Sequence, residues 1–556
     1  MGEAAKTEGA LRLIALGGLG EFGLNAMVLE WEGHRLLLDA GVLFPSAEMP
    51  GIDAIVPDFA YLKDRPESLH GVLLTHGHED HIGALAFALK AAVAPVYGSP
   101  LTLGFARRRL QERGMTADFR ALVPGTPVSV GPFRIHPIRV AHSVTDSLAL
   151  AIETPAGVVL ASGDFKIDAT AKPEERTDVD ALAAWGERGV LVLLSDSTNV
   201  EVRGATGGED DVLPAFREVL ERTRGKVLVS CFATSVPRIQ RVADLAREHG
   251  RSVGFLGRRM VDNATTAVDL GLLRLPDSAT TDPDGLANRP PSKLLLFVSG
   301  SQGEPLSALS AISKDEHRDV GVGPGDTVVL SARPIPGNER TVSRLIGNLF
   351  RRGCDVVHPG TAKVHVSGHG NQDDLLTLLR LVRPQYLVPI HGEYRMLAQH
   401  KRLAVAAGLP ESRVLVVEDG EVLRFDSAGA RQETVTAAGR VLLDGPGDLG
   451  VEDEVVRDRR RLAEDGIVVP VLLIGRASGQ MEKAPHIVSR GFVDRNGEAA
   501  LLLEAEQVLL QDMEGRPREE RRDLALTRER ARLSLRRFFK QRTERRPMVL
   551  PVVMEV

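Results

Sequence analysis

The chain has 556 residues, of which 43% are hydrophobic and 26% charged, and its formal net charge is −6. This length suffices for about three to four domains with a sizeable core. The small negative charge excludes a surface that attracts nucleic acid everywhere, so any RNA or DNA site must be a local basic groove. The two cysteines, Cys231 and Cys354, lie outside any C-x-x-C pattern. We expect two core thiols, a reducing compartment and no disulfide framework.

Targeting signals are missing from the sequence pattern. Residues 1–6 lack the apolar region of a signal peptide, and no window approaches about 18 uninterrupted apolar residues. We therefore expect a cytoplasmic protein without a membrane span.

Three short strands are predicted near the N-terminus, over residues 11–16, 25–31 and 34–39, the last two joined as a hairpin. Residues 18–23 spell G-x-G-x-x-G, but a strand-like segment follows where the dinucleotide fingerprint needs a helix. We interpret this stretch as a flexible active-site loop. Asp39 closes the third strand, either as an ordinary strand-end carboxylate or as an acceptor for a metal-bound histidine.

A dense histidine cluster follows the apolar run 71–74. Residues 76–81 read H-G-H-E-D-H and contain His76, His78, Asp80 and His81. Imidazoles and carboxylates suit zinc or manganese, and the spacing favours two ions about 3.5–4 Å apart, as in phosphodiester-cleaving sites. The zinc-protease pattern H-E-x-x-H is excluded because position 82 is Ile82. A polar loop whose histidines only cap a helix is the disfavoured alternative.

Helices are predicted over residues 83–92 and 101–113, the second with Arg107, Arg108 and Arg109 on a solvated face. Strands are predicted at 128–130, 133–140, 148–153, 158–162 and 191–194. This alternation of strand pairs and helices predicts an α/β fold with an αββα sandwich.

Single polar residues follow three of these strands: His142, Asp164 and Asp196. Each alone is weak evidence, because strand ends often carry polar residues. Together with the cluster at 76–81, they offer the third nitrogen ligand and the bridging carboxylate that a two-metal site needs.

From about residue 200 to 364 the pattern changes. Helical stretches at 212–223, 236–249 and 342–352 alternate with apolar runs at 226–230, 294–298 and 327–330, which predicts an inserted domain with a parallel sheet. The loops 299–304 and 332–339 follow its strands, where open α/β sheets bind ligands.

The segment after the insertion again places histidines at element ends. Residues 365–370 read H-V-S-G-H-G, a helix is predicted at 372–381, and the strand 386–390 leads into His391. A linker-like stretch at 443–453 and a charged helix at 456–464 precede a small αβ unit. Its arginine-dense segment 516–546 predicts an amphipathic helix on a sheet, or a dimer contact, rather than a free basic tail.

These motifs resemble the metallo-β-lactamase superfamily, and the segment between Asp196 and His391 resembles a β-CASP domain. Residues 301–305, 333–339 and 365–369 resemble the ribonuclease J family. The resemblance implies a metallo-β-lactamase domain over residues 1–200 and 365–442 and a β-CASP domain over 201–364. A linker over 443–466 and a C-terminal domain over 467–556 complete the expected organisation. Ala332 departs from the family, whose members often carry a second small hydroxyl after the position of Ser331.

The resemblance also implies site roles. His76, His78 and His142 would hold one ion, and Asp80, His81 and His391 the other, with Asp164 as the bridge and Asp39 in support. Asp80, Asp164, Asp196 and His369 form the expected catalytic set, in which His369 contacts the scissile phosphate or protonates the leaving oxygen. The expected pocket for an RNA phosphate comprises Ala233, Thr234, Ser235, His365, Val366, Ser367, Gly368 and His369.

The implied activity is a metal-dependent ribonuclease that matures and degrades single-stranded RNA, as in rRNA processing and mRNA decay. We expect 5′-to-3′ exonuclease action favouring 5′-monophosphate ends, with endonuclease action as a further activity, through a hydroxide activated by two zinc or manganese ions. A homodimer or homotetramer through the C-terminal domain is expected. A hydrolase of small thioesters or lactams is disfavoured, because the insertion would cap its open site. A non-catalytic RNA-binding scaffold is disfavoured because the ligand set is intact.

Overall fold

The computed structural model describes residues 9–556 except 47, 276–278, 280–284, 286–288, 336, 434–437, 446–449 and 493–497. Position 336 of the 333–339 motif and part of the predicted linker therefore lie outside the described residues. The chain divides into two compact units: Met1–Phe44 with Ile55–Val441, and Pro45–Ala54 with Leu442–Val556. All the predicted site residues belong to the first unit.

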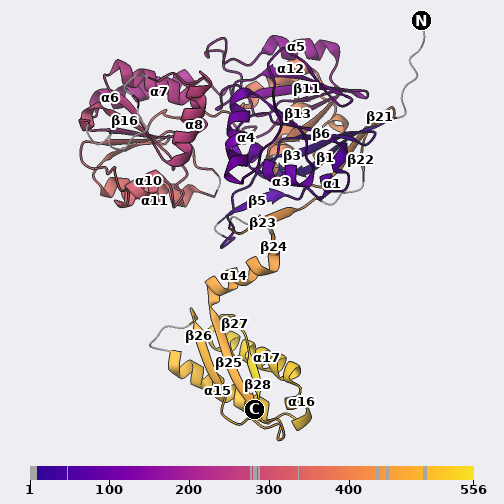
Figure 1. The fold of residues 1–556 in the computed structure, drawn as a ribbon, viewed down its shortest axis with the longest axis vertical. Helices are drawn as coiled ribbons and strands as arrows, with labels where there is room; N and C mark the ends of the chain where they lie inside the picture. Colours follow the sequence, from indigo (N-terminus) through magenta and orange to yellow (C-terminus); the bar gives the residue numbers. More distant parts are fainter. Residues whose placement is uncertain are drawn as a thin grey trace. The chain divides into compact units, whose positions relative to one another are not determined.

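Two sheets form the central layers of the first unit (Figure 1). The eight-stranded sheet has the order β22-β21-β1-β3-β4-β6-β7-β8, and the six-stranded sheet has the order β19-β13-β12-β11-β10-β9. Apolar side chains of both sheets, such as Leu13, Leu29 and Leu150, form one buried core. The strands are β1 (Leu11–Gly17), β3 (Ala26–Trp31), β4 (His34–Leu38), β6 (Leu69–Leu73), β7 (Val96–Gly98), β8 (Phe119–Ala121), β9 (Val128–Val130), β10 (Phe133–Arg139), β11 (Leu148–Thr154), β12 (Gly157–Ala161), β13 (Val192–Asp196), β19 (Tyr386–Ile390), β21 (Val422–Asp426) and β22 (Gly429–Glu433).

Helices cover the outer faces of these sheets. Leu182, Leu378 and Ala404, from three different helices, pack against the outer face of the six-stranded sheet, and α4 packs on β7 and β8. The predicted αββα sandwich is therefore confirmed. The helices and short elements here are α1 (Ala60–Lys63), α3 (Leu85–Ala91), α4 (Pro100–Glu112), α5 (Val179–Arg188), α12 (Gln372–Val382), α13 (Tyr394–Ala406), β2 (Leu19–Gly20), β5 (Ala54–Pro57), β20 (Gly392–Glu393), η1 (Pro66–Ser68) and η4 (Glu411–Arg413).

The helix predicted over residues 83–92 is wrong in its start. A separate turn, α2 (Glu79–Ile82), begins inside the histidine motif, and α3 follows only at Leu85. The amide of Ala84 donates to the carbonyl oxygen of Ala40 (2.8 Å) instead of continuing the helical pattern. The break fixes Asp80 and His81 on a turn of their own.

The inserted domain has a five-stranded parallel sheet with the order β15-β16-β14-β17-β18, which confirms the predicted βαβ pattern. Helices α10 and α11 pack on one face, and α6 and α7 lie on the other (Figure 1). The elements are β14 (Val227–Ser230), β15 (Ser252–Leu256), β16 (Leu294–Val298), β17 (Thr327–Leu330), β18 (Asp355–Val357), α6 (Leu213–Arg222), α7 (Val236–Glu248), α8 (Arg258–Asp269), α10 (Ala308–Lys314), α11 (Glu339–Arg351), η2 (Glu209–Val212) and η3 (Pro291–Lys293).

The insertion leaves and re-enters the six-stranded sheet at neighbouring strands. Strands β12, β13 and β19 run parallel, and Asp196 pairs in register with Ile390. Parallel strands end at the same edge of a sheet, so the residues that follow them meet there. This register brings Asp164, Asp196 and His391 together across more than two hundred residues of chain.

The second unit is built around β25, whose residues alternate between buried and partly exposed. Val468 and Leu472 pack with Leu535 and Phe539 of α17, so the predicted amphipathic helix on a small sheet is confirmed. The elements are β23 (Arg440–Leu443), β24 (Gly450–Val451), β25 (Ile467–Ile474), β26 (His486–Arg490), β27 (Met548–Val549), β28 (Val552–Glu555), α14 (Asp453–Asp465), α15 (Glu498–Glu514), α16 (Arg518–Arg522) and α17 (Leu524–Thr543). No helix in the described part of the chain is long and apolar enough to cross a membrane.

Candidate metal centre

The loop that carries the histidine motif is held firmly at its start. The backbone N–H of Thr75 donates to Asp39 Oδ1 (2.8 Å), and the Thr75 hydroxyl donates to Asp39 Oδ2 (2.9 Å). Asp39 adopts a left-handed backbone with φ of 57°, as does His391. Such strained positions concentrate at functional sites, and here both lie beside the motif.

Three imidazoles and one carboxylate form the first group. The Nε2 atoms of His76 and His142 lie 3.1 and 3.2 Å from His78 Nδ1. Asp164 Oδ2 lies 3.4 Å from His76 Nε2 and 3.8 Å from His142 Nε2. Ligand atoms about 2.0–2.1 Å from a tetrahedral zinc ion lie about 3.3 Å from one another. These separations fit four ligands of one ion.

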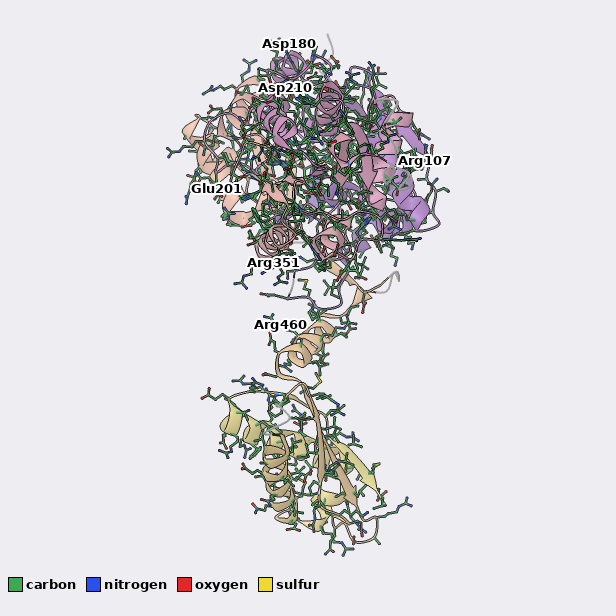
Figure 2. The ribbon with its side chains drawn as sticks, turned by 90° about the vertical axis from the view of Figure 1, so that its left-hand side faces the viewer. Arg107, Asp180, Glu201, Asp210, Arg351 and Arg460 are labelled. Carbon is green, nitrogen blue, oxygen red and sulfur yellow. The ribbon has the colours of Figure 1, made fainter. Side chains whose placement is uncertain are left out.

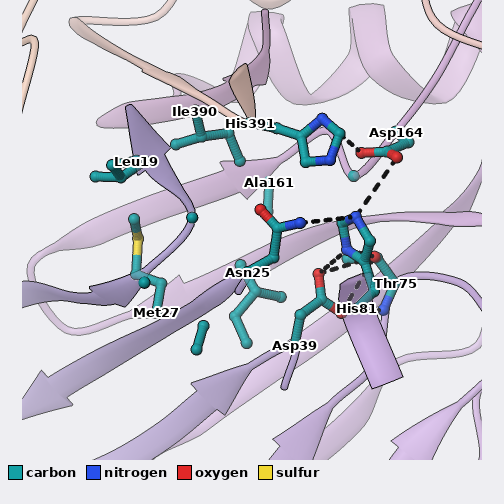
Figure 3. A pocket seen from close by; sticks show the side chains of 15 residues that line it. Leu19, Asn25, Met27, Asp39, Thr75, His81, Ala161, Asp164, Ile390 and His391 are labelled. Atoms are coloured by element: carbon teal, nitrogen blue, oxygen red, sulfur yellow. Dashed lines mark hydrogen bonds and ion pairs between the residues drawn. The ribbon is translucent and has the colours of Figure 1, made fainter. Parts of the chain in front are cut away.

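A second group lies on the other side of Asp164. His391 Nε2 is 3.2 Å and His81 Nε2 is 3.8 Å from Asp80 Oδ2. Asp164 contacts this group as well, with Oδ2 at 3.5 Å from His81 Nε2 and Oδ1 at 3.7 Å from His391 Nδ1. Figure 3 shows Asp164 between His391 and His81. The seven predicted ligands therefore converge on two adjoining groups that share one carboxylate.

An orphaned atom tests whether metal ions fit here. Asp164 Oδ2 is buried and accepts no hydrogen bond from any described residue. A buried carboxylate oxygen without a donor is costly unless a cation or a donor pairs with it. The donor set of imidazole nitrogens and carboxylate oxygens is the one that zinc prefers. The site therefore fits a pair of divalent ions.

The second ring nitrogen of each predicted histidine ligand contacts an oxygen. His81 Nδ1 lies 2.8 Å from Asp39 Oδ2. This contact has the geometry expected if Asp39 is an acceptor for a metal-bound histidine, the second of its two predicted roles. Such contacts fix the tautomer and aim the other nitrogen at the metal. The remaining pairs are His76 Nδ1 with Thr75 Oγ1 (3.1 Å), His142 Nδ1 with the Gly368 carbonyl (2.8 Å), His391 Nδ1 with Thr198 Oγ1 (2.6 Å) and His78 Nε2 with Ser143 Oγ (3.3 Å).

Sequence reasoning missed Thr198 and Asn25. Thr198 Oγ1 donates to Asp196 Oδ1 (2.7 Å) while it contacts His391, so it links two predicted site residues. Its position two residues after Asp196 was the available signal. Asn25 Nδ2 lies 3.2 Å from His81 Nε2 and donates to the Asp80 carbonyl (3.0 Å). Nothing in the strand pattern around Asn25 marks it.

Charge and burial set the protonation of the two groups. Burial lowers the pKa of His76 and His142, and that of His78 to about 4, so these rings favour the neutral form that binds metal. Burial acts in the same direction on His391, but Asp164 and Asp196 raise its pKa to about 10. Because metal ligands must be deprotonated, an ion has to displace the His391 proton.

His369 lies beside the two groups, against Asp196. Its Nδ1 is 2.8 Å from Asp196 Oδ2, and its ring stacks on His391 with centroids 5.3 Å apart. Asn199 Nδ2 donates to the carbonyl oxygen of His369 (3.0 Å) and to Ser367 Oγ (2.9 Å). These contacts hold the His369 ring at Nδ1 and its backbone at the carbonyl oxygen.

The predicted phosphate pocket draws on two loops. Ala233, Thr234 and Ser235 precede α7, and residues 365–368 precede α12. Ser235, Val366 and Gly368 are buried, whereas Thr234, His365 and Ser367 keep partial exposure. A Cβ on Gly368 would lie 2.7 Å from the His142 ring, so only glycine fits there. The role of this set stays a prediction.

The loop at residues 18–23 lies beside the centre. Gly18 and Leu19 line a small cavity together with Asp39, His81 and His391 (Figure 3). Strand β2 pairs with β20, so Leu19 is in register with Gly392, next to His391. The loop therefore lies beside the centre, where backbone pairing holds it, and its predicted flexibility stays a prediction.

The prediction of a solvated face for the three arginines of α4 holds only for Arg107, which is exposed (Figure 2). Arg109 pairs with Glu79 (Nε to Oε1, 2.8 Å), and Arg108 pairs with Asp262 of α8 (3.1 Å). Glu79 also pairs with Arg259 (3.2 Å). The motif's remaining carboxylate thus joins α4 to α8, a long-range pairing that helix periodicity cannot reveal.

Comparison with known families agrees with this geometry. Residues 19–194 match the metallo-beta-lactamase superfamily, and residues 224–349 match the ribonuclease J beta-CASP domain. Residues 356–416 match a Zn-dependent metallo-hydrolase RNA specificity domain, and residues 454–556 match the ribonuclease J C-terminal domain.

Relatives extend over nearly the whole chain. Ribonuclease J of Mycobacterium tuberculosis is 37% identical over 99% of this chain and 98% of its own length. Ribonuclease J 1 of Streptococcus pyogenes is 35% identical over 98% and 97%, and ribonuclease J of Synechocystis is 40% identical over 87% and 76%. A crystal structure of a protein of unknown function from Enterococcus faecalis shares the fold, with a TM-score of 0.50 at 16% identity over 74% of this chain and 99% of that one. The chain therefore belongs to the ribonuclease J family of the metallo-β-lactamase superfamily, with a β-CASP domain.

Proposed function

We propose that this protein is a metal-dependent ribonuclease that degrades single-stranded RNA from its 5′ end and favours a 5′-monophosphate. Internal cleavage at the same centre is the second proposed activity. The observation that carries the proposal is the pair of ligand groups that adjoin at Asp164, whose Oδ2 lies 3.4 Å from His76 Nε2 and 3.5 Å from His81 Nε2, in a chain whose relatives are named ribonuclease J.

Two bound divalent ions would lower the pKa of a water from 15.7 towards about 7 and stabilise charge on the phosphate. We assign His76, His78 and His142 to one ion and Asp80, His81 and His391 to the other. Zinc is the first choice, since the matched RNA specificity domain is described as Zn-dependent, and manganese is the alternative. The Asp164 carboxylate faces both groups and is the proposed bridge.

His369 and Asp196 are assigned to the phosphate. Because Asp196 engages His369 at Nδ1, the Nε2 atom is left to contact the scissile phosphate or to protonate the leaving 3′-oxygen. Cleavage on that side leaves a 5′-phosphate on the remaining RNA. Each round then regenerates the end that the enzyme prefers.

A phosphate pocket would explain the 5′-end preference. Ser367 Oγ accepts from Asn199 Nδ2 and from the His369 amide (3.1 Å), so its hydroxyl position is fixed. Backbone N–H groups and hydroxyls of the 365–369 loop can form a small anion-binding concavity. We add Ala233, Thr234 and Ser235 from the loop before α7. With only four tyrosines and two tryptophans in the chain, base stacking should be limited and sequence preference weak.

The test is degradation of 5′-labelled RNA carrying a monophosphate, a triphosphate or a hydroxyl, with Zn²⁺ or Mn²⁺. We expect labelled mononucleotide from the monophosphorylated RNA first. Asp80→Ala should abolish cleavage but retain RNA binding, and Asp180→Ala, an exposed carboxylate on α5 (Figure 2), should match the native enzyme. Full activity in Asp80→Ala would overturn the site assignment. Thioester or lactam turnover without RNA cleavage would favour the small-molecule hydrolase.

We also propose self-association through the second unit. Val469, Val471 and Leu473 of β25 pair in register with residues of β26 and β28 and share their outward face. On that face Val488, Val552 and Met554 are 40%, 38% and 44% exposed. Apolar patches of this kind favour a protein partner, and a second copy gives the predicted homodimer or homotetramer. Met554→Glu should lower the mass measured by light scattering, whereas Leu503→Glu on α15 should not.

The cytoplasmic location of the protein stays a prediction.

A further inference from the structure

Arg238 lies in α7 of the inserted domain and is only 2% exposed. All five of its N–H donors are used. Nε and one Nη2 donor bind the two carboxylate oxygens of Glu209, both at 2.9 Å. The other Nη2 donor binds the Val366 carbonyl (2.9 Å). The two Nη1 donors bind the Ser331 carbonyl (3.0 Å) and His365 Nδ1 (2.8 Å).

This guanidinium therefore ties four segments together at one point: α7, the turn η2, the residue after β17 and the 365–366 segment. Glu209 is also buried, with Lys166 Nζ at 3.4 Å as a second cation. A planar fork with five donors can meet these acceptors at once, whereas a lysine ammonium offers three donors from one atom. The arrangement thus requires arginine.

The contact with His365 has a chemical consequence. A guanidinium donates hydrogen bonds, accepts none and stays charged in proteins. The Nδ1 atom of His365 must therefore act as an acceptor and carry no proton, which places the single ring proton on Nε2. Protonation of Nδ1 would set an N–H against a guanidinium donor inside a buried cluster.

We propose that Arg238 is a positioning residue of the phosphate pocket, which holds His365 as the neutral Nε2–H tautomer and so presents an uncharged hydrogen-bond donor to the RNA 5′-phosphate. The proposal rests on the phosphate pocket assigned above. It makes substrate recognition at His365 insensitive to pH over the working range. The substrate phosphate, with a second pKa of about 6, then titrates against a donor that does not change.

The charges that face His365 agree with this assignment. Burial lowers the pKa of His365 to about 3, and Arg238 and Arg333 act in the same direction. Glu209 raises the pKa, but its two oxygens are already engaged by Arg238. Burial and the two guanidiniums, Arg238 from α7 and Arg333 from the loop after β17, therefore outweigh Glu209 and the Ser331 backbone, which raise the pKa of His365, and the ring stays uncharged.

The first experiment reads the tautomer directly. Native protein with ¹⁵N-labelled histidine rings is followed by NMR from pH 5.5 to 8.5, and His365 is identified by the signals lost in His365→Gln. We expect the shifts of a neutral Nε2–H imidazole without a titration midpoint in this range. A midpoint between pH 5.5 and 8.5, or the Nδ1–H tautomer, would overturn the proposal whether or not the protein cleaves RNA.

The second experiment tests the consequence for substrate binding. KM for 5′-monophosphorylated RNA is measured from pH 5.5 to 8 for the native enzyme, Arg238→Met and the control Arg241→Met. Arg241 lies on the same helix and pairs with Glu175 (2.8 Å). Ionisation of the substrate phosphate changes KM of the native and variant enzymes alike, so this effect cancels in the ratio of variant KM to native KM. In Arg238→Met the freed His365 can take up a proton at a pH of about 6.5.

We expect the KM ratio of Arg238→Met to rise about five- to tenfold from pH 5.5 to 8, with a smaller change in kcat, because a charged donor binds phosphate more strongly. The ratio of Arg241→Met should stay flat, and so should that of Arg238→Met on 5′-hydroxyl RNA. If Arg238→Met does not fold, Arg238→Met with Glu209→Gln removes both charges and serves instead. A flat ratio in the folded variant would refute the inference. A native enzyme without preference for 5′-monophosphate would instead refute the proposed function.

Discussion

Two buried charged clusters of this chain differ in whether their hydrogen bonds are complete. Around Arg238, all five donors and both oxygens of Glu209 have partners within the protein. In the metal centre, Asp164 Oδ2 has no donor among the described residues, and imidazole nitrogens face one another at 3.1–3.2 Å. A closed cluster holds elements together, and an open one is built to receive something. The difference distinguishes a positioning device from a binding site.

The largest effect should come from a substitution of Asp164 in the metal centre. Asp164→Ala removes the atom that both ligand groups share, so we expect kcat to fall by about a thousandfold or more. Metal content measured by mass spectrometry should fall below two ions per chain. Asp180→Ala again serves as the control. An Asp164→Ala enzyme with native metal content and activity would show that the open carboxylate is not the bridge.

A substitution in the closed cluster around Arg238 should instead lower the free energy of unfolding. Glu209→Ala leaves Arg238 buried without its carboxylate, and breaking one partner of a buried pair costs about 3–5 kcal/mol. The measurement is urea unfolding of metal-free protein. Asp211→Ala, which removes a more exposed pair with Lys363, should cost less than about 1 kcal/mol. Equal losses in the two variants would contradict the distinction.

The carboxyl group of Asp146 is also largely buried but belongs to neither cluster. Asp146 accepts from Ser99 Oγ (2.7 Å) and the Leu101 amide (2.9 Å), and burial raises its pKa to about 6. The folded state then binds more protons than the unfolded state between pH 4 and 6. Stability should therefore fall as pH rises through this window, by about 3 kcal/mol from this group.

Asp146→Asn removes that titration. The difference in unfolding free energy between variant and native protein should grow in favour of the variant from pH 4 to pH 7. Chemical denaturation of metal-free protein at four pH values measures it. A difference that is constant with pH would show that Asp146 is already ionised at pH 4.

The smallest effects should come from the residues that aim the ligand rings. Asp39→Asn and Thr198→Val each weaken the contact to one Nδ1 atom, and such losses cost about 10–100-fold in metal affinity. We expect Asp39→Asn to lie at the higher end, because a charged acceptor is stronger. Competition with a chelator gives both values. Unchanged affinity in both would mean that packing alone orients the rings.

Much of this could be predicted from residues that lie close together in sequence. The apolar run before Thr75 marked a buried strand, and the H-x-H-x-D-H spacing marked a metal loop. Strand-like segments that alternate with helices marked both sheets. The break between α2 and α3 was missed because it depends on a hydrogen bond from the Ala84 amide to the distant carbonyl oxygen of Ala40. The pairing of Arg109 with Glu79 was missed because helix periodicity does not show which arginine meets a carboxylate from another segment.

The sequence by itself determined the types of ligand and the order of the elements that carry them, because strand and helix periodicity follow from local backbone geometry. Its short motifs carried the resemblance to the family. Only the tertiary structure decided which atoms meet. The register of β13 with β19 places Asp196 beside His391, and Thr198 and the Gly368 carbonyl then complete the ligand rings. Two of the five bonds of Arg238 likewise join residues more than a hundred positions apart. Such partners depend on packing between distant segments, which a local pattern does not encode.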